Sequence, residues 1–456
     1  MARRFGAPTI ILGPVLYFRG EQGDRWRLSA LFALDGDAEP EDLEVEGVGL
    51  PVPPRHLAAW RGRHLWRFDF AVPRKADDAT VTYGFPCGTR WPIAVPGRDA
   101  APPRIAFTSC NGAEHPRTLD SHGPPRNALW EDLARQHELA PFHLLIQGGD
   151  QLYADGVWRD CPALAAWRRR PSTRFAEPFS ATMAEEAMDH YFGLYLATWG
   201  QPEVAEVLAR IPSVMMWDDH DIYDGWGSLP KREQTAPVPR GVFMVARRTF
   251  ALFQLAATPD ALPECVWGQE TGTFTQGFVV GGIGILAPDL RSERTPERVL
   301  SSRSRKALPG WLERFDACRH LLLVSSVPLL LTGTGGLERA LAALPGRNRF
   351  EDDLRDQWRS PAHAAEWRRL VETLAAFSVR TGCGITALSG EIHLGAQAVL
   401  SGPVEILQLI ASGIVHPPPP RLFAALLDRL ARRRRVDDPR RSEEHTSELQ
   451  SRVDSS

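Results

Sequence analysis

The sequence has little of several features that would point to particular classes of protein. Its 456 residues include six cysteines, at positions 87, 110, 161, 265, 318 and 383, which are too few and too scattered for a disulfide framework. The longest apolar runs, Phe278 to Ala287 and Leu321 to Leu331, are about half of the roughly 20 residues that span a bilayer. We therefore expect a soluble protein with reduced thiols and no membrane partner.

Charge of one sign is also lacking. Lys and Arg number 53 against 56 for Asp and Glu, which leaves a formal charge of −3. This balance does not favour a polyanionic partner, and we interpret Arg432 to Arg435 as a solvated helix end instead of a nucleic-acid patch. Lysine occurs only as Lys75, Lys231 and Lys306, a skew typical of GC-rich codon usage.

The two ends of the sequence need separate interpretation. Arg3 and Arg4 precede an apolar stretch that superficially resembles a twin-arginine export signal, but prolines and a glycine interrupt it. We predict a first β-strand there and a cytoplasmic location, with export as the alternative. At the other end, residues 441–451 read RSEEHTSELQS, the translation of a widely used sequencing adapter. We expect residues 441–456 to be an artefact; a native polar tail is the alternative.

The organisation between the ends changes near residue 98. Before it, runs such as His64 to Val72 alternate aromatic and polar residues, which predicts an N-terminal antiparallel β-sandwich over residues 1–98. After it, short apolar runs alternate with helical patterns, which predicts a layered α/β domain over residues 99–440. The mostly helical stretch 158–210 is expected to be an insertion or lid beside the site.

Four predicted strands are each followed directly by side chains that can act as ligands. The strands Ile105–Thr108, Phe142–Gln147, Val214–Trp217 and Ile385–Leu388 end in Ser109-Cys110-Asn111, Gly148 to Tyr153, Asp218 to Asp221 and Ser389 to His393, respectively. In open α/β sheets, ligands bind at the carboxyl ends of strands. Clustered carboxylates repel each other unless cations compensate them, and this donor set suits an open metal centre. Asp150 could bridge two ions.

The motifs SCN at 109–111, GGDQLYAD at 148–155, WDDHDIYDGW at 217–226 and SGEIH at 389–393 resemble the successive motifs of the alkaline phosphatase D (PhoD-like) family of the metallophosphatase superfamily. The likeness covers residues 104–416, and the family usually carries a β-rich N-terminal domain. It implies a metallophosphatase-type β-sandwich flanked by helices, and hydrolysis of phosphate monoesters or diesters.

The resemblance also implies roles for single residues. Cys110 would be the thiolate ligand of iron, Asp150 the bridging aspartate and Tyr153 a tyrosinate ligand. Asp219 would be a further metal ligand, and His220 would contact the phosphate or protonate the leaving oxygen. The family uses iron together with calcium, and the superfamily more broadly uses two transition ions, so manganese and zinc are alternatives.

The fourth motif departs from the family pattern. Its Glu391 stands where the family usually has Asp, and with His393 it would complete the implied metal ligands. In the third motif, Asp221 stands where Glu is common in the family and Asp224 stands where Asn is usual. His416 lies where family members vary, and we rank it as a peripheral candidate.

Other residues have two interpretations. Tyr153 is either a ligand or a packed side chain whose hydroxyl is satisfied. We expect Asp218 to orient His220 instead of binding metal directly. His143 is expected to be a satisfied core histidine or to hold Asp150.

The sequence therefore predicts a metal-dependent phosphohydrolase acting on a phosphate ester. Two cations would lower the pKa of a bridging water, and the resulting hydroxide would attack phosphorus in line. Arg291 would either clamp the phosphate or form an ordinary surface ion pair. One rival is a non-catalytic relative whose metal centre serves binding. Another is a metal-dependent amide or lactone hydrolase, which predicts no inhibition by phosphate or vanadate.

Overall fold

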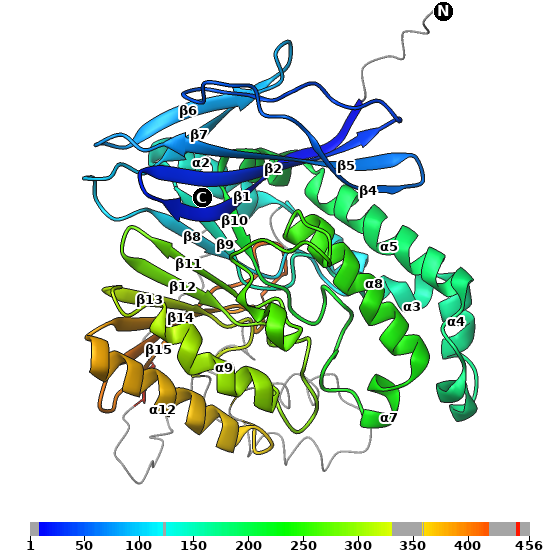
Figure 1. Cartoon of the computed structure of the whole chain (residues 1–456). Helices are drawn as coiled ribbons and strands as arrows, with labels where there is room; N and C mark the ends of the chain where they lie inside the picture. The colour runs from blue at the N-terminus through cyan, green and yellow to red at the C-terminus, as the bar shows by residue number, and fades with distance from the viewer. Residues whose placement is uncertain (1–8, 122–124, 331–357, 359, 419–443, 447–456) are drawn as a thin grey trace, which may run out of the picture.

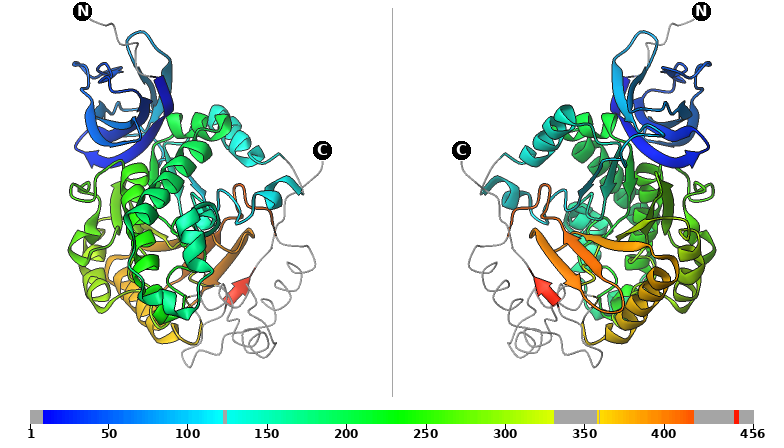
Figure 2. Two further views of the ribbon diagram at one scale, coloured as in Figure 1. Left: turned by 90° about the vertical axis from the view of Figure 1, so that its right-hand side faces the viewer. Right: turned by 90° about the vertical axis from the view of Figure 1, so that its left-hand side faces the viewer.

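The computed structural model describes residues 9–121, 125–330, 358, 360–418 and 444–446. In this part of the chain two large β-sheets pack face to face and helices lie on their outer sides (Figure 1). A smaller sheet packs at the N-terminal end, above the rest of the molecule in Figures 1 and 2. The predicted α/β class, a layered β-sandwich flanked by helices, is confirmed.

The first sheet contains three of the four strands that were expected to carry ligands. Its order is β4 (Arg55–Trp60), β5 (Arg63–Pro73), β2 (Arg25–Asp35), β1 (Thr9–Gln22), β10 (Ser213–Met215), β9 (Leu144–Gln147) and β8 (Ile105–Thr108). Strands β8, β9 and β10 are parallel neighbours, so their carboxyl ends lie at one edge. Burial on both faces explains why they read as short continuous apolar runs.

The second sheet contains the fourth of those strands. Its order is β11 (Gln276–Val280), β12 (Ile283–Ala287), β13 (His320–Val324), β14 (Gly384–Ser389), β16 (Ile406–Ile410), β15 (Ala396–Leu400) and β17 (Glu444–Thr446). The expected ligand-bearing strands therefore come from two facing sheets and not from one. Strand β17 falls within the suspected adapter segment, most of which lies outside the described residues.

The N-terminal strands form the predicted sandwich, but the sheet does not break at residue 98. The small sheet β3 (Glu44–Val45), β6 (Ala79–Gly84) and β7 (Arg90–Val95) packs on β2 and β5 through ring contacts such as Phe32 on Trp91 and Phe70 on Tyr83. Strand β1 also pairs in parallel with β10, with Tyr17 opposite Ser213. The first sheet therefore runs through both predicted domains, and their boundary stays a prediction.

Helices cover both outer faces of the sandwich. The α-helices of the described residues are α1 (Pro116–Ser121), α2 (Ala128–Leu139), α3 (Val157–Asp160), α4 (Pro162–Arg168), α5 (Ala181–Trp199), α6 (Pro202–Arg210), α7 (Lys231–Gln234), α8 (Pro237–Gln254), α9 (Ser302–Glu313) and α12 (Ala364–Thr381). The Ser180 hydroxyl caps α5 by accepting from the Met183 N–H, and α12 ends at Gly382 with a φ of 73°. None of the described helices is both long and apolar enough to cross a bilayer.

Three apolar clusters hold these layers together. The first lies between the two large sheets and includes Ile146, Val214 and Ile285. The second joins the first sheet to α2, α5, α6 and α8, and the third joins the second sheet to α9 and α12. The strand ends that carry the polar motifs therefore project from a rigid, fully packed support.

One buried carboxylate ties the loops after β9 and β10 together. Asp221 Oδ2 accepts the backbone N–H groups of Asp150 and Asp218 at 2.8 and 2.9 Å. Its Oδ1 accepts from the Leu152 N–H at 3.1 Å and from Gln254 Nε2 at 2.8 Å. Burial raises the pKa of Asp221 to about 7, although these donors lower it. Asp221, at the position where Glu is common in the family, therefore acts as a structural brace: its carboxylate holds the loops after β9 and β10 together.

Replacing this carboxylate tests the brace. In Asp221→Asn an amide NH₂ faces N–H donors, and each buried donor left without an acceptor costs roughly 1–3 kcal/mol. We expect denaturant unfolding to show a stability loss of roughly 2–4 kcal/mol. Asp316→Asn, which removes an exposed ion pair with Arg380, is the control and should change stability by less than about 1 kcal/mol. Equal stability of the two variants would contradict the brace.

Candidate metal centre

The loops after β8, β9 and β10 bring three acidic or imidazole side chains and one thiol together. Asp150, Asp219 and His220 each offer a ligand atom, and these atoms all lie within 4.8 Å of one another. Cys110 Sγ lies 3.5 Å from Asp150 Oδ2. Four of the residues predicted from the strand ends thus meet in space.

The backbone around these residues is strained. Cys110 and Asp150 have φ values of 56° and 58°, and Glu391 and His393 have φ values of 70° and 57°. Side chains other than glycine rarely adopt this left-handed region, and such strain clusters at functional sites. Gly149, with a φ of 123°, has no room for a side chain because an added Cβ would lie 2.8 Å from Asp218 Cβ.

The electrostatics of this group call for a cation. Burial raises the pKa of Asp150 well above its usual value, and the nearby carboxylates raise it further although His220 opposes them. Burial and Asp150 likewise raise the pKa of the Cys110 thiol. Asp150 Oδ1 and the Tyr153 hydroxyl are buried and have no hydrogen-bond partner among the described residues. An ion at this position would stabilise the charged forms and satisfy these atoms, so the donor set fits a metal.

Asp155 orients His220. The sequence had predicted Asp218 in this role. His220 Nδ1 lies 3.1 and 3.0 Å from the two oxygens of Asp155, which leaves Nε2 as the nitrogen that can face a ligand. Burial lowers the pKa of His220, but Asp155, Asp219 and Asp150 outweigh it and hold the pKa well above its usual value. The only sequence signal for Asp155 was its place at the end of the GGDQLYAD motif.

Arg291 and Asp218 form a buried ion pair beside this group. The Arg291 side chain is 0% exposed, and its Nε donates to Asp218 Oδ1 while its Nη2 lies 3.3 Å from Asp219 Oδ1. Ser326 Oγ also donates to Asp218 Oδ1, at 2.7 Å. Of the two interpretations of Arg291, the surface ion pair is wrong, because the guanidinium is buried and pairs with the carboxylates of Asp218 and Asp219. The phosphate clamp stays a prediction. His143 is a satisfied core histidine whose Nδ1 accepts the Arg104 N–H at 3.0 Å.

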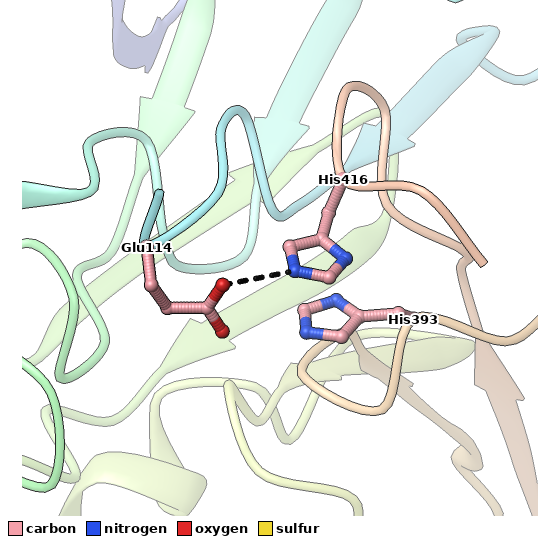
Figure 3. Close-up of side chains that lie close together, drawn as sticks. All are labelled: Glu114, His393 and His416. Carbon is pink, nitrogen blue, oxygen red and sulfur yellow. Dashed lines mark ion pairs between the residues drawn. The ribbon is translucent and has the colours of Figure 1, made fainter. Parts of the chain in front are cut away.

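A second group lies close to the first. Glu114, His393 and His416 offer ligand atoms within 4.8 Å of one another. Figure 3 shows that their side chains point toward one another. The His416 ring stacks on His393 at 3.4 Å and on Tyr153 at 5.8 Å. Tyr153 in turn stacks on His220 at 4.3 Å, so Tyr153 connects the two groups. His416 is thus not peripheral, and Glu114 was missed because nothing in the sequence pairs it with the distant histidines.

Glu391 belongs to neither group among the described residues, although it was predicted to be a ligand with His393. Its backbone N–H instead lowers the pKa of the Cys110 thiol by hydrogen bonding to it. The close approach of the Glu391 backbone to Cys110 depends on Gly390, since an added Cβ at Gly390 would lie 1.9 Å from Ser109 Oγ. The ligand role of Glu391 stays a prediction.

Comparisons with known proteins place the chain in a family and show a shared fold. A family model described as PhoD related phosphatase matches residues 77–343. The uncharacterized protein YGR266W of Saccharomyces cerevisiae is 26% identical over 495 residues, spanning 88% of this chain and 69% of the yeast protein. A solved structure of PhoD covers 91% of this chain and 79% of its own, at 13% identity and a TM-score of 0.55, which shows a shared fold.

A dimetal phosphatase from Danio rerio also matches, over 70% of this chain and 90% of its own, at 10% identity. Its TM-score of 0.37 is too low to support a conclusion about this chain. The family model spans more than half of the sequence and includes the first three ligand motifs. The chain therefore belongs to the family of PhoD related phosphatases.

Proposed function

We propose that this protein is a metal-dependent phosphohydrolase that cleaves phosphate esters at the Asp150 group. The observation that carries the proposal is the convergence of Asp150, Asp219, His220 and Cys110 at adjoining strand ends. Asp150 Oδ1 is buried there and makes no hydrogen bond within the part of the chain that the structure describes. Family membership supports it. Metal ions at such a site lower the pKa of water and neutralise charge on the phosphate oxygens.

The metal ligands in this proposal are Cys110, Asp150, Tyr153 and Asp219. Cys110, Asp150 and Tyr153 supply a thiol, a carboxylate and a phenol that are buried together, and the environment of each opposes its charged form in the absence of a cation. Arg291 pairs with Asp218 and Asp219, which restricts Asp219 to one position. Such thiolate, phenolate and carboxylate donors suit iron, and the oxygen donors also suit calcium, manganese or zinc.

His220 is proposed to donate the proton that the leaving oxygen needs. Asp155 accepts at Nδ1, so the imidazolium presents its Nε2–H to the reacting group. Asp155, followed by Asp219 and Asp150, raises the pKa of His220 well above its usual value although burial lowers it. Buried Arg291 acts on the carboxylates and not on the phosphate, so it is a positioning residue in this proposal.

Removing the Asp150 charge tests the function. Mutating residues that hydrogen-bond to metal ligands lowers metal affinity or activity by roughly 10–100-fold. Asp150→Asn changes a proposed ligand itself, so we expect it to lower both metal affinity and hydrolysis by at least about 100-fold. Bound metals are measured by elemental analysis after purification without chelator, and hydrolysis is measured on chromogenic phosphate monoesters and diesters. Asp316→Asn serves as the matched surface control.

Several outcomes would contradict the phosphohydrolase. Metal-loaded wild-type protein that hydrolyses neither ester would point to a non-catalytic binding relative. Hydrolysis of amides or lactones without inhibition by phosphate or vanadate would point to another hydrolase class. An Asp150→Asn variant with unchanged activity would remove this residue from the site.

Replacing Asp155 tests the proton donor. Asp155→Asn keeps an acceptor for Nδ1 but removes the charge that raises the pKa of His220. Because activity would require the imidazolium, the alkaline limb of the pH–rate profile should move down by about 1–3 pH units. Bound metal should not change. Asp160→Asn, an exposed carboxylate on the same segment, is the control. Loss of metal in Asp155→Asn would instead make His220 a ligand.

A further inference from the structure

Two histidines of the N-terminal strands lie side by side, far along the first sheet from the Asp150 group. His56 is on β4 and His64 is on β5, at the edge opposite to β8 (Figure 1). His56 Nε2 lies 3.1 Å from His64 Nδ1, and the two ring planes are inclined at 44°. This pair is separate from both groups of the candidate metal centre.

The local backbone brings the two rings together. His56 lies opposite Trp66 on β5, and the register shifts between His56 and Ala58, which makes Leu57 the extra residue of a bulge. A bulge changes the direction of the side chains beside it. His64 and Trp66 are two residues apart on one strand and therefore share a face of the sheet. The His56 ring packs on Trp66 with centroids 4.8 Å apart, which restricts its position beside His64.

The outer hydrogen bond of His64 defines which of its nitrogens carries a proton. His64 Nε2 lies 3.3 Å from Asp37 Oδ1, and a carboxylate oxygen accepts hydrogen bonds. Nε2 is therefore the protonated nitrogen in the neutral ring. Nδ1, the nitrogen that faces His56, then has a lone pair.

His56 is in the complementary state. Burial and the neighbouring His64 lower the pKa of His56, whereas a hydrogen bond to the Ala58 backbone raises it. A hydrogen bond raises the pKa of an imidazole when the imidazole is the donor, so His56 donates to Ala58. Because Nε2 faces His64, the donor is Nδ1, and Nε2 has a lone pair. The two lone pairs of the histidine pair therefore face each other.

The distance between these nitrogens matches that of two ligands of one metal ion. Facing lone pairs repel each other unless a cation or a shared proton lies between them. Imidazole nitrogens lie about 2.0–2.1 Å from zinc, so two of them are about 3.3 Å apart in tetrahedral coordination and about 2.9 Å apart in adjacent octahedral positions. The observed 3.1 Å lies between these values.

We propose that His56 and His64 bind one divalent transition ion, such as Zn²⁺, Cu²⁺ or Ni²⁺, and that Asp37 orients His64. Imidazole ligands suit these ions, and a carboxylate on the far nitrogen is the usual support of a metal-binding histidine. His56 is exposed, so the ion can enter from solvent and complete its coordination with water. The site does not depend on the proposed phosphohydrolase, because its residues lie on other strands.

Metal stoichiometry tests the site. The full chain is equilibrated with Zn²⁺ by dialysis, and bound metal is measured by elemental analysis. Wild type should bind one ion more than His56→Gln and one ion more than His64→Gln. Asp37→Asn should keep this ion but bind it roughly 10-fold more weakly. Arg55→Gln and Asp24→Asn, at exposed positions of the same sheet, are the matched controls and should bind as wild type does.

Electron paramagnetic resonance of bound Cu²⁺ identifies the ligands directly. The chain with Asp150→Asn, which weakens the other centre, is titrated with Cu²⁺, and wild type is titrated in parallel. We expect a signal with coupling to two imidazole nitrogens in both, and its loss when His64→Gln is added. Circular dichroism of each variant checks its folding.

The outcomes separate this site from the proposed function. Unchanged metal content in both His56→Gln and His64→Gln, with no imidazole coupling in wild type, would overturn the site and leave a pair that shares a proton. Hydrolysis of phosphate esters should be the same in wild type and His64→Gln. A wild-type protein that hydrolyses no phosphate ester but shows the His64-dependent Cu²⁺ signal would uphold the site and overturn the function.

Discussion

The candidate centre depends on one buried carboxylate, that of Asp221. Asp221 accepts hydrogen bonds from the backbone of the loops after β9 and β10, and so fixes Asp150 and Asp218 relative to each other. A carboxylate buried this deeply persists only if its oxygens are satisfied, and here four N–H donors satisfy them. The strained φ of Asp150 is held by the same interaction. The position of Asp150 therefore depends on Asp221, which accepts its backbone N–H.

Charge balance is the second constraint on the site. Arg291 neutralises part of the negative charge by pairing with Asp218 and Asp219, yet the pKa values of Asp150 and Cys110 remain well above their usual range. The guanidinium of Arg291 thus offsets the negative charge of Asp218 and Asp219, whereas no such cationic side chain pairs with Asp150 or Cys110 among the described residues.

Much of the fold followed from local sequence pattern. The apolar runs at β8, β9, β10 and β14 were recognised, since short buried strands need continuous apolar residues, although β9 starts at Leu144 and β10 ends at Met215, inside the predicted runs. The pattern could not assign these strands to sheets. Strand β14 belongs to the facing sheet, and β1 pairs with β10 across the predicted domain boundary. Periodicity reports which faces are buried, whereas pairing depends on partners far away in the chain.

The sequence by itself determined the chemical types of the donors and their places after strands: Cys110, Asp150 and Asp219 needed only strand recognition and the likeness of four motifs. Only the tertiary structure decided that Asp155 and not Asp218 holds His220, and that Glu114 meets His393 and His416. The physical reason is that local propensity and side-chain period constrain residues a few positions apart. Contacts between loops of two facing sheets are instead set by how the apolar core packs those sheets together.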